Sequence, residues 1–140
     1  IYTNLESQKS NEIKNNPVAS MCFHWKSLLR QIRITGKISK VSNKEADEYF
    51  NSRDYESRIG AWASKQSSKL ESRDQLYQKI DEYKKKFPYK NNVTRPTHWS
   101  GWRLDPYKYE FWLDGENRIH QRLKYLKLEN DEWEKSLLSP

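Results

Sequence analysis

Arginine and histidine side chains recur at every second position near the C-terminal end of this 140-residue sequence, at Arg118, His120 and Arg122. On a β-strand, alternate residues lie on one face, so these side chains would stand side by side. Such a cluster is unfavourable unless an anion or water meets it. The spacing therefore predicts a site for a flat anionic ligand, with Trp112 on the preceding strand as an aromatic neighbour. A solvated outer face of a basic protein accounts for the same pattern, and the periodicity does not separate the two.

A second candidate site combines Tyr49, Arg53 and Ser57. Tyr49 and Arg53 are four residues apart in a predicted helix, so they lie on the same helix face. A phenol, a guanidinium and a hydroxyl form a set suited to a small phosphate group. The alternative interpretation places Tyr49 in the core and Arg53 in solvent.

The remaining polar residues carry weaker signals. The stretch Lys65–Ser68 is a predicted polar loop or helix end, whose amide and hydroxyl groups could bind a ligand or cap a helix. His24 and His98 each neighbour a tryptophan, which favours packing over catalysis. The sequence contains no Ser/His/Asp arrangement, metal-ligand spacing or phosphate-binding glycine loop. Difficult chemistry would therefore have to come from an organic cofactor.

Three helices are predicted to position these residues. Ser42, with Glu45 three residues later, forms a capping-box pattern at the start of the first helix. A second helix is expected over Ser57–Ala63. The third begins near Ser72 and ends before Pro88. The apolar stripe of this third helix consists of Leu76, Ile80, Tyr83 and Phe87.

The strands are predicted from alternation and from turn residues. Ile1–Thr3 has the composition of the end of a strand, and Tyr89–Thr97 is expected to be a loop. Two strands are predicted in the first third of the chain, and an antiparallel meander in the last third. The first two are Val18–Trp25 and Arg30–Gly36, and Gln31 and Arg33 lie on one face of the second. The meander consists of the strands Tyr107–Trp112 and Arg118–Leu126 and a short strand around Trp133. A hairpin turn at Asp114 and Gly115 joins the first two of these strands, and a turn at Asn130 and Asp131 precedes the third.

Composition indicates a folded, basic protein. Aromatic residues make up 14% of the chain, which favours an aromatic core in one domain over residues 1–140. The net charge of +7 attracts anions, which could be nucleic acid, an acidic membrane surface or a small phosphorylated ligand. No apolar run is long enough to cross a membrane, and we expect a soluble, cytoplasmic protein. The single cysteine, Cys22, lies in an apolar run and is predicted to be buried and inert.

Several separated strings of residues resemble pyridoxamine 5'-phosphate oxidase over essentially the whole chain. The strings are Tyr2–Asn4, Arg30 with Gln31, Tyr49 and Phe50 with Arg53 and Ser57, Ile59–Ser67, Glu110–Trp112 and Arg118–Arg122. The strings Ile59–Ser67 and Arg-x-His-x-Arg are specific in combination. The resemblance implies an α+β split β-barrel of antiparallel strands with peripheral helices, which is a homodimer with FMN bound noncovalently at the subunit interface.

The implied reaction oxidises pyridoxine or pyridoxamine 5'-phosphate with dioxygen to pyridoxal 5'-phosphate and hydrogen peroxide. The resemblance further implies a role for each matched residue. Arg118 and His120 are the implied catalytic residues over the substrate ring, and Tyr49, Arg53 and Ser57 are the implied contacts of the substrate phosphate. The implied flavin contacts are Tyr2, Thr3, Lys9, Gln31, Gln66, Ser67, Trp112 and Arg122.

The sequence also departs from the family pattern. The family string Ser-Arg-Lys reads Ser7, Gln8, Lys9 here, and the final Arg-Leu-x-Pro reads Leu137–Pro140, so weaker FMN binding is expected. We also expect the family's preceding N-terminal strands to be absent from these residues. Two alternatives follow: a flavin- or pyridoxal-phosphate-binding module without turnover, and, more remotely, a basic nucleic-acid-binding domain.

Overall fold

The computed structural model describes residues 1–140. The chain divides into two compact units, each built from two separate chain segments. Unit 1 comprises Ile1–Asn16 and Lys40–Arg103, and unit 2 comprises Pro17–Ser39 and Leu104–Pro140. The expectation of a single domain stays a prediction.

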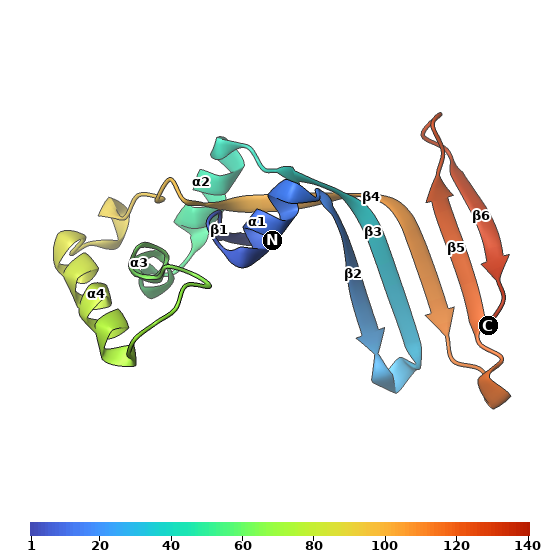
Figure 1. Ribbon diagram of the computed structural model, residues 1–140. Coiled ribbons are helices and arrows are strands. Elements are labelled where there is room, and N and C mark those ends of the chain that lie inside the picture. The colour runs from blue at the N-terminus through green and yellow to red at the C-terminus, as the bar shows by residue number, and fades with distance from the viewer. The chain divides into compact units, whose positions relative to one another are not determined.

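Unit 1 contains the four α-helices and one short strand pair. The helices are α1 (Gln8–Asn15), α2 (Asn43–Ser52), α3 (Tyr55–Ala63) and α4 (Arg73–Lys86) (Figure 1). Strand β1 (Tyr2–Asn4) pairs antiparallel with Trp99–Gly101, the start of β4 (Trp99–Leu113). The predicted loop Tyr89–Thr97 contains a short 3₁₀ helix, η2 (Lys90–Asn92).

A side chain caps the N-terminus of each helix in the same way. Ser7, Ser42, Asp54 and Ser72 each accept a hydrogen bond from the backbone N–H three residues later. Such caps satisfy amide groups that have no partner within the helix. The predicted starts at Ser42 and Ser72 are confirmed. The predicted helical position of Arg53 is wrong, because α2 ends at Ser52 and Arg53 is its extended C-cap residue. The predicted helix Ser57–Ala63 begins earlier, at Tyr55, because Asp54 supplies the cap.

The core of unit 1 is largely aromatic, as composition predicted. Phe50, Ile59, Val93 and Trp99 form a buried cluster. Ile80, Tyr83 and Phe87 of the predicted α4 stripe pack against it, so the stripe serves packing. Gly101 is required in this unit because a Cβ at that position would lie 2.8 Å from the ring of Tyr2.

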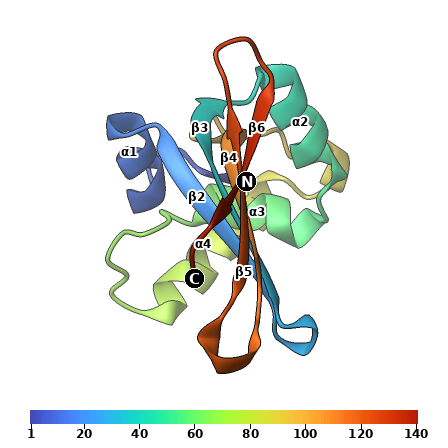
Figure 2. The same ribbon diagram turned by 90° about the vertical axis from the view of Figure 1, so that its right-hand side faces the viewer.

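Unit 2 is an antiparallel sheet in the order β2-β3-β4-β5-β6. Its strands are β2 (Val18–Trp25), β3 (Arg30–Lys40), β4 from Leu104 onward, β5 (Gln121–Lys127) and β6 (Trp133–Leu138). Figure 2 views the molecule from the β6 side, so the β5–β6 hairpin lies in front. The strand Val18–Trp25, the turn at Asn130 and Asp131 and the strand around Trp133 are confirmed, while β3 and β4 are longer than predicted.

The predicted strand Arg118–Leu126 is wrong at its start. Strand β5 begins at Gln121, and residues 114–120 form a connection that contains the short helix η3 (Glu116–Arg118). Asn117 and Arg118 have φ angles of 56° and 65°, which no strand residue adopts. The two-residue turn at Asp114 and Gly115 is therefore replaced by a longer connection. Gly115 is needed in it because a Cβ would meet the Ile119 carbonyl oxygen at 2.0 Å.

The burial predicted for Cys22 is also wrong. Its thiol is exposed, and almost every residue of β2 is exposed with it. Burial in a sheet depends on what packs on each face, and the apolar run itself supplies no such cover. No helix of the chain is both long and apolar enough to span a membrane.

Candidate functional site

The predicted site residues are distributed over both units, and each group is described by itself. Unit 1 holds Tyr2, Thr3, Lys9, Tyr49, Arg53, Ser57, Gln66 and Ser67, whereas unit 2 holds Gln31, Trp112, Arg118, His120 and Arg122.

In unit 1, Arg53 is partly buried and Tyr49 is exposed. The Arg53 guanidinium lies over the Trp99 ring, 4.9 Å from its centroid, whereas Tyr49 is 45% exposed. The alternative with Tyr49 in the core and Arg53 in solvent is therefore wrong. The Nη1 atom of Arg53 is buried and has no hydrogen-bond partner. Because buried polar groups normally have a hydrogen-bond partner, this nitrogen is suited to donate a hydrogen bond to an acceptor atom of a ligand.

Burial lowers the pKa of the Arg53 guanidinium, although the neighbouring Tyr49 and Asp54 act in the opposite direction. A free guanidinium titrates so far above neutrality that Arg53 stays charged. A desolvated cation that lacks a partner is costly, and an anion would offset that cost. Arg53 is thus suited to bind a phosphate group.

Ser57 lies in the first turn of α3. Its backbone N–H and its hydroxyl both donate to the Asp54 carboxylate, at 2.8 Å each. These hydrogen bonds lower the pKa of Asp54. In this structure Ser57 therefore completes a helix cap, at a helix end that favours negative charge. The hydrogen bonds of Ser57 go to Asp54 and not to Arg53.

Arg58 is a site-supporting residue that the sequence analysis missed. It is only 5% exposed, and its guanidinium donates to the carbonyl oxygens of Asn51, Arg53 and Lys90. These bonds hold the backbone of Arg53 in place. An arginine next to the buried Ile59 was the available signal, because a charge at such a position requires partners.

Gln66 links the predicted polar loop to β1. Its side-chain oxygen accepts hydrogen bonds from the Thr3 hydroxyl at 3.0 Å and from the Asn4 backbone N–H at 3.1 Å. Both Thr3 and Asn4 are buried, so this anchor fixes Gln66 beside the strand. Ser67 has a φ of 68°, in a turn closed by the Ser68 N–H donating to the Lys65 carbonyl oxygen.

Lys9 is exposed near the start of α1. Gln8, at the departure from the family string, donates to Glu12 on the same helix at 2.9 Å. Among the minor histidine candidates, His24 is exposed, and His98 Nε2 lies 3.0 Å from the Ala61 carbonyl oxygen beside the Trp62 ring.

In unit 2, a buried carboxylate lies between two arginines. Glu110 is 8% exposed, and Arg33 donates to its Oε2 at 2.5 Å. Arg122 Nε and Nη2 lie 3.0 Å and 2.8 Å from its Oε1. Burial raises the pKa of Glu110, but hydrogen bonds and charge from Arg33 and Arg122 outweigh burial and hold the pKa below its usual value.

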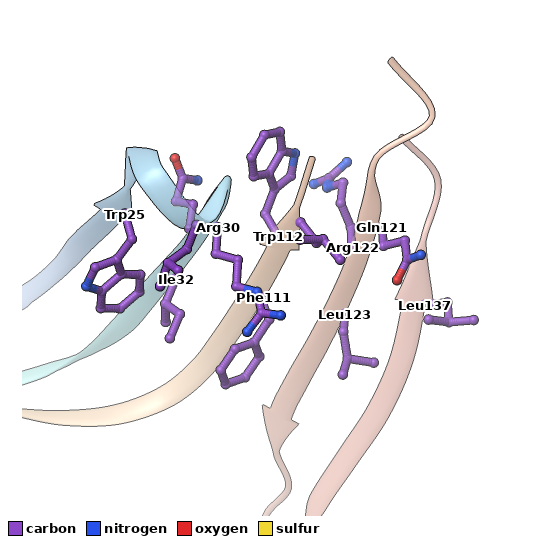
Figure 3. A pocket seen from close by; sticks show the side chains of 12 residues that line it. Trp25, Arg30, Ile32, Phe111, Trp112, Gln121, Arg122, Leu123 and Leu137 are labelled. Carbon is purple, nitrogen blue, oxygen red and sulfur yellow. The ribbon is translucent and has the colours of Figure 1, made fainter. Parts of the chain in front are cut away.

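Trp112 and Arg122 are cross-strand partners on β4 and β5. Figure 3 shows both on one side of the sheet, with Phe111 and Leu123 on the other. A cavity of about 590 Å³ opens at this edge. It is lined by Trp25, Leu28, Arg30, Gln31, Ile32, Phe111, Trp112, Leu113, Gln121, Arg122, Leu123 and Leu137. Three predicted flavin contacts, Gln31, Trp112 and Arg122, thus share one cavity.

His120 reaches Trp112 from the β4–β5 connection. The two ring centroids are 4.8 Å apart, and His120 Nδ1 lies 3.0 Å from an Asp114 carboxylate oxygen. Arg118 is exposed and has left-handed backbone geometry. The predicted strand face with Arg118, His120 and Arg122 is therefore wrong, since only Arg122 belongs to a strand. The structure nevertheless places the His120 ring beside Trp112, which is the aromatic neighbour that the sequence predicted.

Two family models together cover most of the sequence. Residues 1–87 match the model described as pyridoxamine 5'-phosphate oxidase, and residues 99–140 match the pyridoxine 5'-phosphate oxidase C-terminal dimerisation region. The chain belongs to the pyridoxamine 5'-phosphate oxidase family. The recognition made from the sequence strings is confirmed.

Curated members of this family are similar in sequence to nearly the whole chain. The chain is 69% identical to the pyridoxine/pyridoxamine 5'-phosphate oxidase of Pelagibacter ubique, over 99% of this chain and 67% of the relative. It is 51% identical to the enzyme of the same name from Allorhizobium ampelinum, over 89% of this chain and 60% of the relative. The chain thus spans about two thirds of the length of these oxidases.

Solved structures confirm the predicted fold of the family. The crystal structure of PhzG from Burkholderia lata, in complex with tetrahydrophenazine-1-carboxylic acid, superposes with a TM-score of 0.89 and 29% identity. That match covers 100% of this chain and 67% of PhzG. A pyridoxamine 5'-phosphate oxidase-related, FMN-binding protein from Nostoc punctiforme has a TM-score of 0.73, over 99% of this chain and 71% of the other; at 15% identity it supports the fold alone.

Proposed function

We propose that this chain forms the larger part of an FMN-dependent oxidase that converts pyridoxamine or pyridoxine 5'-phosphate to pyridoxal 5'-phosphate. Membership of the family, together with relatives that carry this name, supports the reaction. The observation in this chain that carries the proposal is the buried Arg53 Nη1, which lacks an acceptor and fits a phosphate oxygen.

The substrate phosphate contacts in this proposal are Arg53, Tyr49 and Ser57. Arg53 supplies a charge-assisted hydrogen bond from a position that Trp99 and Arg58 hold rigid. Tyr49 is exposed on α2, which ends one residue before Arg53, and can donate its phenol hydroxyl. Ser57 contributes once its hydroxyl turns away from Asp54, which costs one hydrogen bond.

The proposed flavin contacts are Tyr2, Thr3, Lys9, Gln31, Gln66, Ser67, Trp112 and Arg122. Within unit 2, the cavity that Gln31, Trp112 and Arg122 line combines an aromatic plane with a cation and an amide, which suits the edge of a flat ring system. FMN, when bound, supplies the acceptor for the hydride equivalents that leave the 4' carbon of the substrate, and dioxygen is the proposed final oxidant. The protein contributes binding and orientation.

Arg118 and His120 are the proposed contacts over the substrate ring. The Asp114 carboxylate and the Gly115 N–H both approach His120 Nδ1 and orient the imidazole, so Nε2 is the nitrogen proposed to meet a substrate polar group. Arg118 is exposed in this chain and can extend a guanidinium to the same ligand. We further propose a homodimer, consistent with the match of residues 99–140 to a dimerisation region, and a cytoplasmic location.

An absorbance spectrum tests the oxidase assignment directly. The purified protein is mixed with FMN, desalted and then given pyridoxine 5'-phosphate under air. A retained flavin band followed by growth of the pyridoxal 5'-phosphate absorbance is expected. A retained band without product or peroxide would favour the binding module without turnover. Oligonucleotide binding with a steep salt dependence, in a protein that retains no flavin, would favour the nucleic-acid alternative.

A further inference from the structure

Glu110 occupies a central position on the polar face of the unit 2 sheet. Residues 110 and 112 of β4 lie two apart, so Glu110 shares a face with Trp112. Arg122 is the cross-strand partner of Trp112 on that face. A buried carboxylate there requires compensation, because burying a lone charge is unfavourable.

The compensation comes from both neighbouring strands. Arg33 on β3 donates to one carboxylate oxygen at 2.5 Å, and Arg122 on β5 approaches the other through Nε and Nη2. The remaining terminal nitrogen of Arg122, Nη1, donates to the Ser139 carbonyl oxygen at 2.8 Å. All the nitrogens of Arg122 are therefore held, and the plane of the guanidinium is set.

We propose that Glu110 is a positioning residue, which fixes the Arg122 guanidinium beside Trp112 in the orientation that the flavin requires. This inference rests on the proposed function and extends it to a residue that touches neither cofactor nor substrate. The Arg122 side chain remains 28% exposed, so one edge of the guanidinium can still meet a ligand. Without Glu110, Arg33 and Arg122 would repel each other and Arg122 would sample several rotamers.

A purely structural role for Glu110, as a tie between β3, β4 and β5, is the competing explanation. The two roles differ in what Arg33 should do. If Glu110 only ties strands, Arg33→Gln and Glu110→Gln should be equivalent. If Glu110 positions Arg122, Arg33→Gln should leave the Arg122 contacts in place, because each arginine binds a different carboxylate oxygen.

The first measurement is an arginine Nε–H NMR spectrum of the protein without added flavin, which reports on Arg122 directly. Wild-type protein should show a distinct, slowly exchanging Arg122 Nε–H signal. Glu110→Gln should abolish this signal, whereas Arg33→Gln and the control Glu134→Gln, an exposed acid on β6, should retain it. Retention of the signal in Glu110→Gln would overturn the proposal without reference to flavin.

The second measurement is FMN affinity by quenching of flavin fluorescence. Glu110→Gln should weaken FMN binding about tenfold, which is within the range of interaction energies between residues in contact. Arg33→Gln and Glu134→Gln should change FMN affinity less than about twofold. In an Arg122→Gln background, the added Glu110→Gln change should have no further effect. Equal losses in Glu110→Gln and Arg33→Gln, or additive losses in the double variant, would overturn the positioning role. Wild-type protein that binds no FMN would contradict the proposed function, and the NMR signal would still decide the position of Arg122.

Discussion

The ring of Tyr2 stacks on the ring of Tyr49, with centroids 3.7 Å apart and an angle of 9° between the planes. Tyr2 lies on β1 and Tyr49 on α2, and Trp99 stacks against both. The Tyr2 hydroxyl donates to Glu45 on the same helix at 3.2 Å. A proposed flavin contact and a proposed substrate contact are thus held in one aromatic stack.

Removal of the Tyr49 ring should therefore affect stability as well as binding. We expect Tyr49→Ala to lower the free energy of unfolding by about 1 kcal/mol more than Tyr77→Ala, because Tyr77 is exposed and forms no ring stack. Tyr49→Phe should keep the stability but raise the KM for the phosphorylated substrate, since the phenol is lost. Urea unfolding and steady-state kinetics measure the two effects. Equal destabilisation by the two alanine variants would contradict the role of the stack.

Inorganic phosphate should stabilise the protein through Arg53. Its Nη1 is buried without a partner, so bound phosphate fills an unmet hydrogen bond and raises the melting temperature by mass action. Arg53→Met should remove this effect without a large loss of basal stability, because the Nη1 of this partly buried guanidinium makes no hydrogen bond that the substitution would break. Thermal unfolding in phosphate against equal ionic strength of chloride measures the response. Arg73→Met, at an exposed position, is the control and should respond as wild type does.

Acid should destabilise the protein partly through Glu110. The pKa of Glu110 in the folded chain lies below the ordinary value of 4.5, so its stabilising contribution is present above that value. The contribution is lost as the pH falls from about 4.5 through the lower folded pKa. Glu110→Gln should be less stable than wild type at neutral pH and show a shallower loss in acid. Urea unfolding between about pH 6 and about pH 3, which spans the titration range of carboxyl groups, measures this effect, and an unchanged slope would contradict it.

The left-handed backbone of Arg118 makes a glycine substitution informative. With a φ of 65°, a residue that carries a Cβ is strained, whereas glycine is not. Arg118→Gly should be more stable than Arg118→Ala by about 1 kcal/mol, and both should lose turnover. Unfolding curves of the two variants provide the comparison. The opposite order of stability would show that Arg118 adopts an extended conformation in solution.

The apolar face of the unit 2 sheet should govern dimerisation. Tyr109, Phe111, Tyr125 and Trp133 line an apolar depression of about 320 Å³ there, and Phe111 is 38% exposed. Phe111→Lys should weaken the dimer at least tenfold, because it would bury an unpaired charge in the interface. Sedimentation velocity over a concentration series measures this change. Glu129→Lys, on the exposed β5–β6 turn, should leave the dimer intact.

Most elements could be predicted because their signals are local. Ser42 and Ser72 mark helix starts through hydrogen bonds to residues three positions later, and alternation at Ile32 and Ile34 marks β3. Local signals gave a wrong prediction for the β4–β5 connection. The pattern Arg-x-His-x-Arg alternates like a strand, yet Asn117 and Arg118 turn the chain and His120 binds back to Asp114. Asn117 and Gly115 were the only local hints, since both residue types tolerate unusual backbone angles.

The sequence by itself determined the family, the helix starts at Ser42 and Ser72, the strands β2 and β6, and the candidate phosphate-binding residues Tyr49, Arg53 and Ser57, whereas helix α1 and the Asp54 cap of α3 were not predicted. Only the tertiary structure decided which of these side chains are buried and paired. Arg53 lies over Trp99, which is far from it in the sequence, and Glu110 binds an arginine 77 positions away. Caps and alternation act within a few residues, whereas burial and ion pairing depend on segments that meet only after folding. For this reason the role of Glu110, which arises from contacts with Arg33 and Arg122 on two other strands, could not be recognised from the sequence.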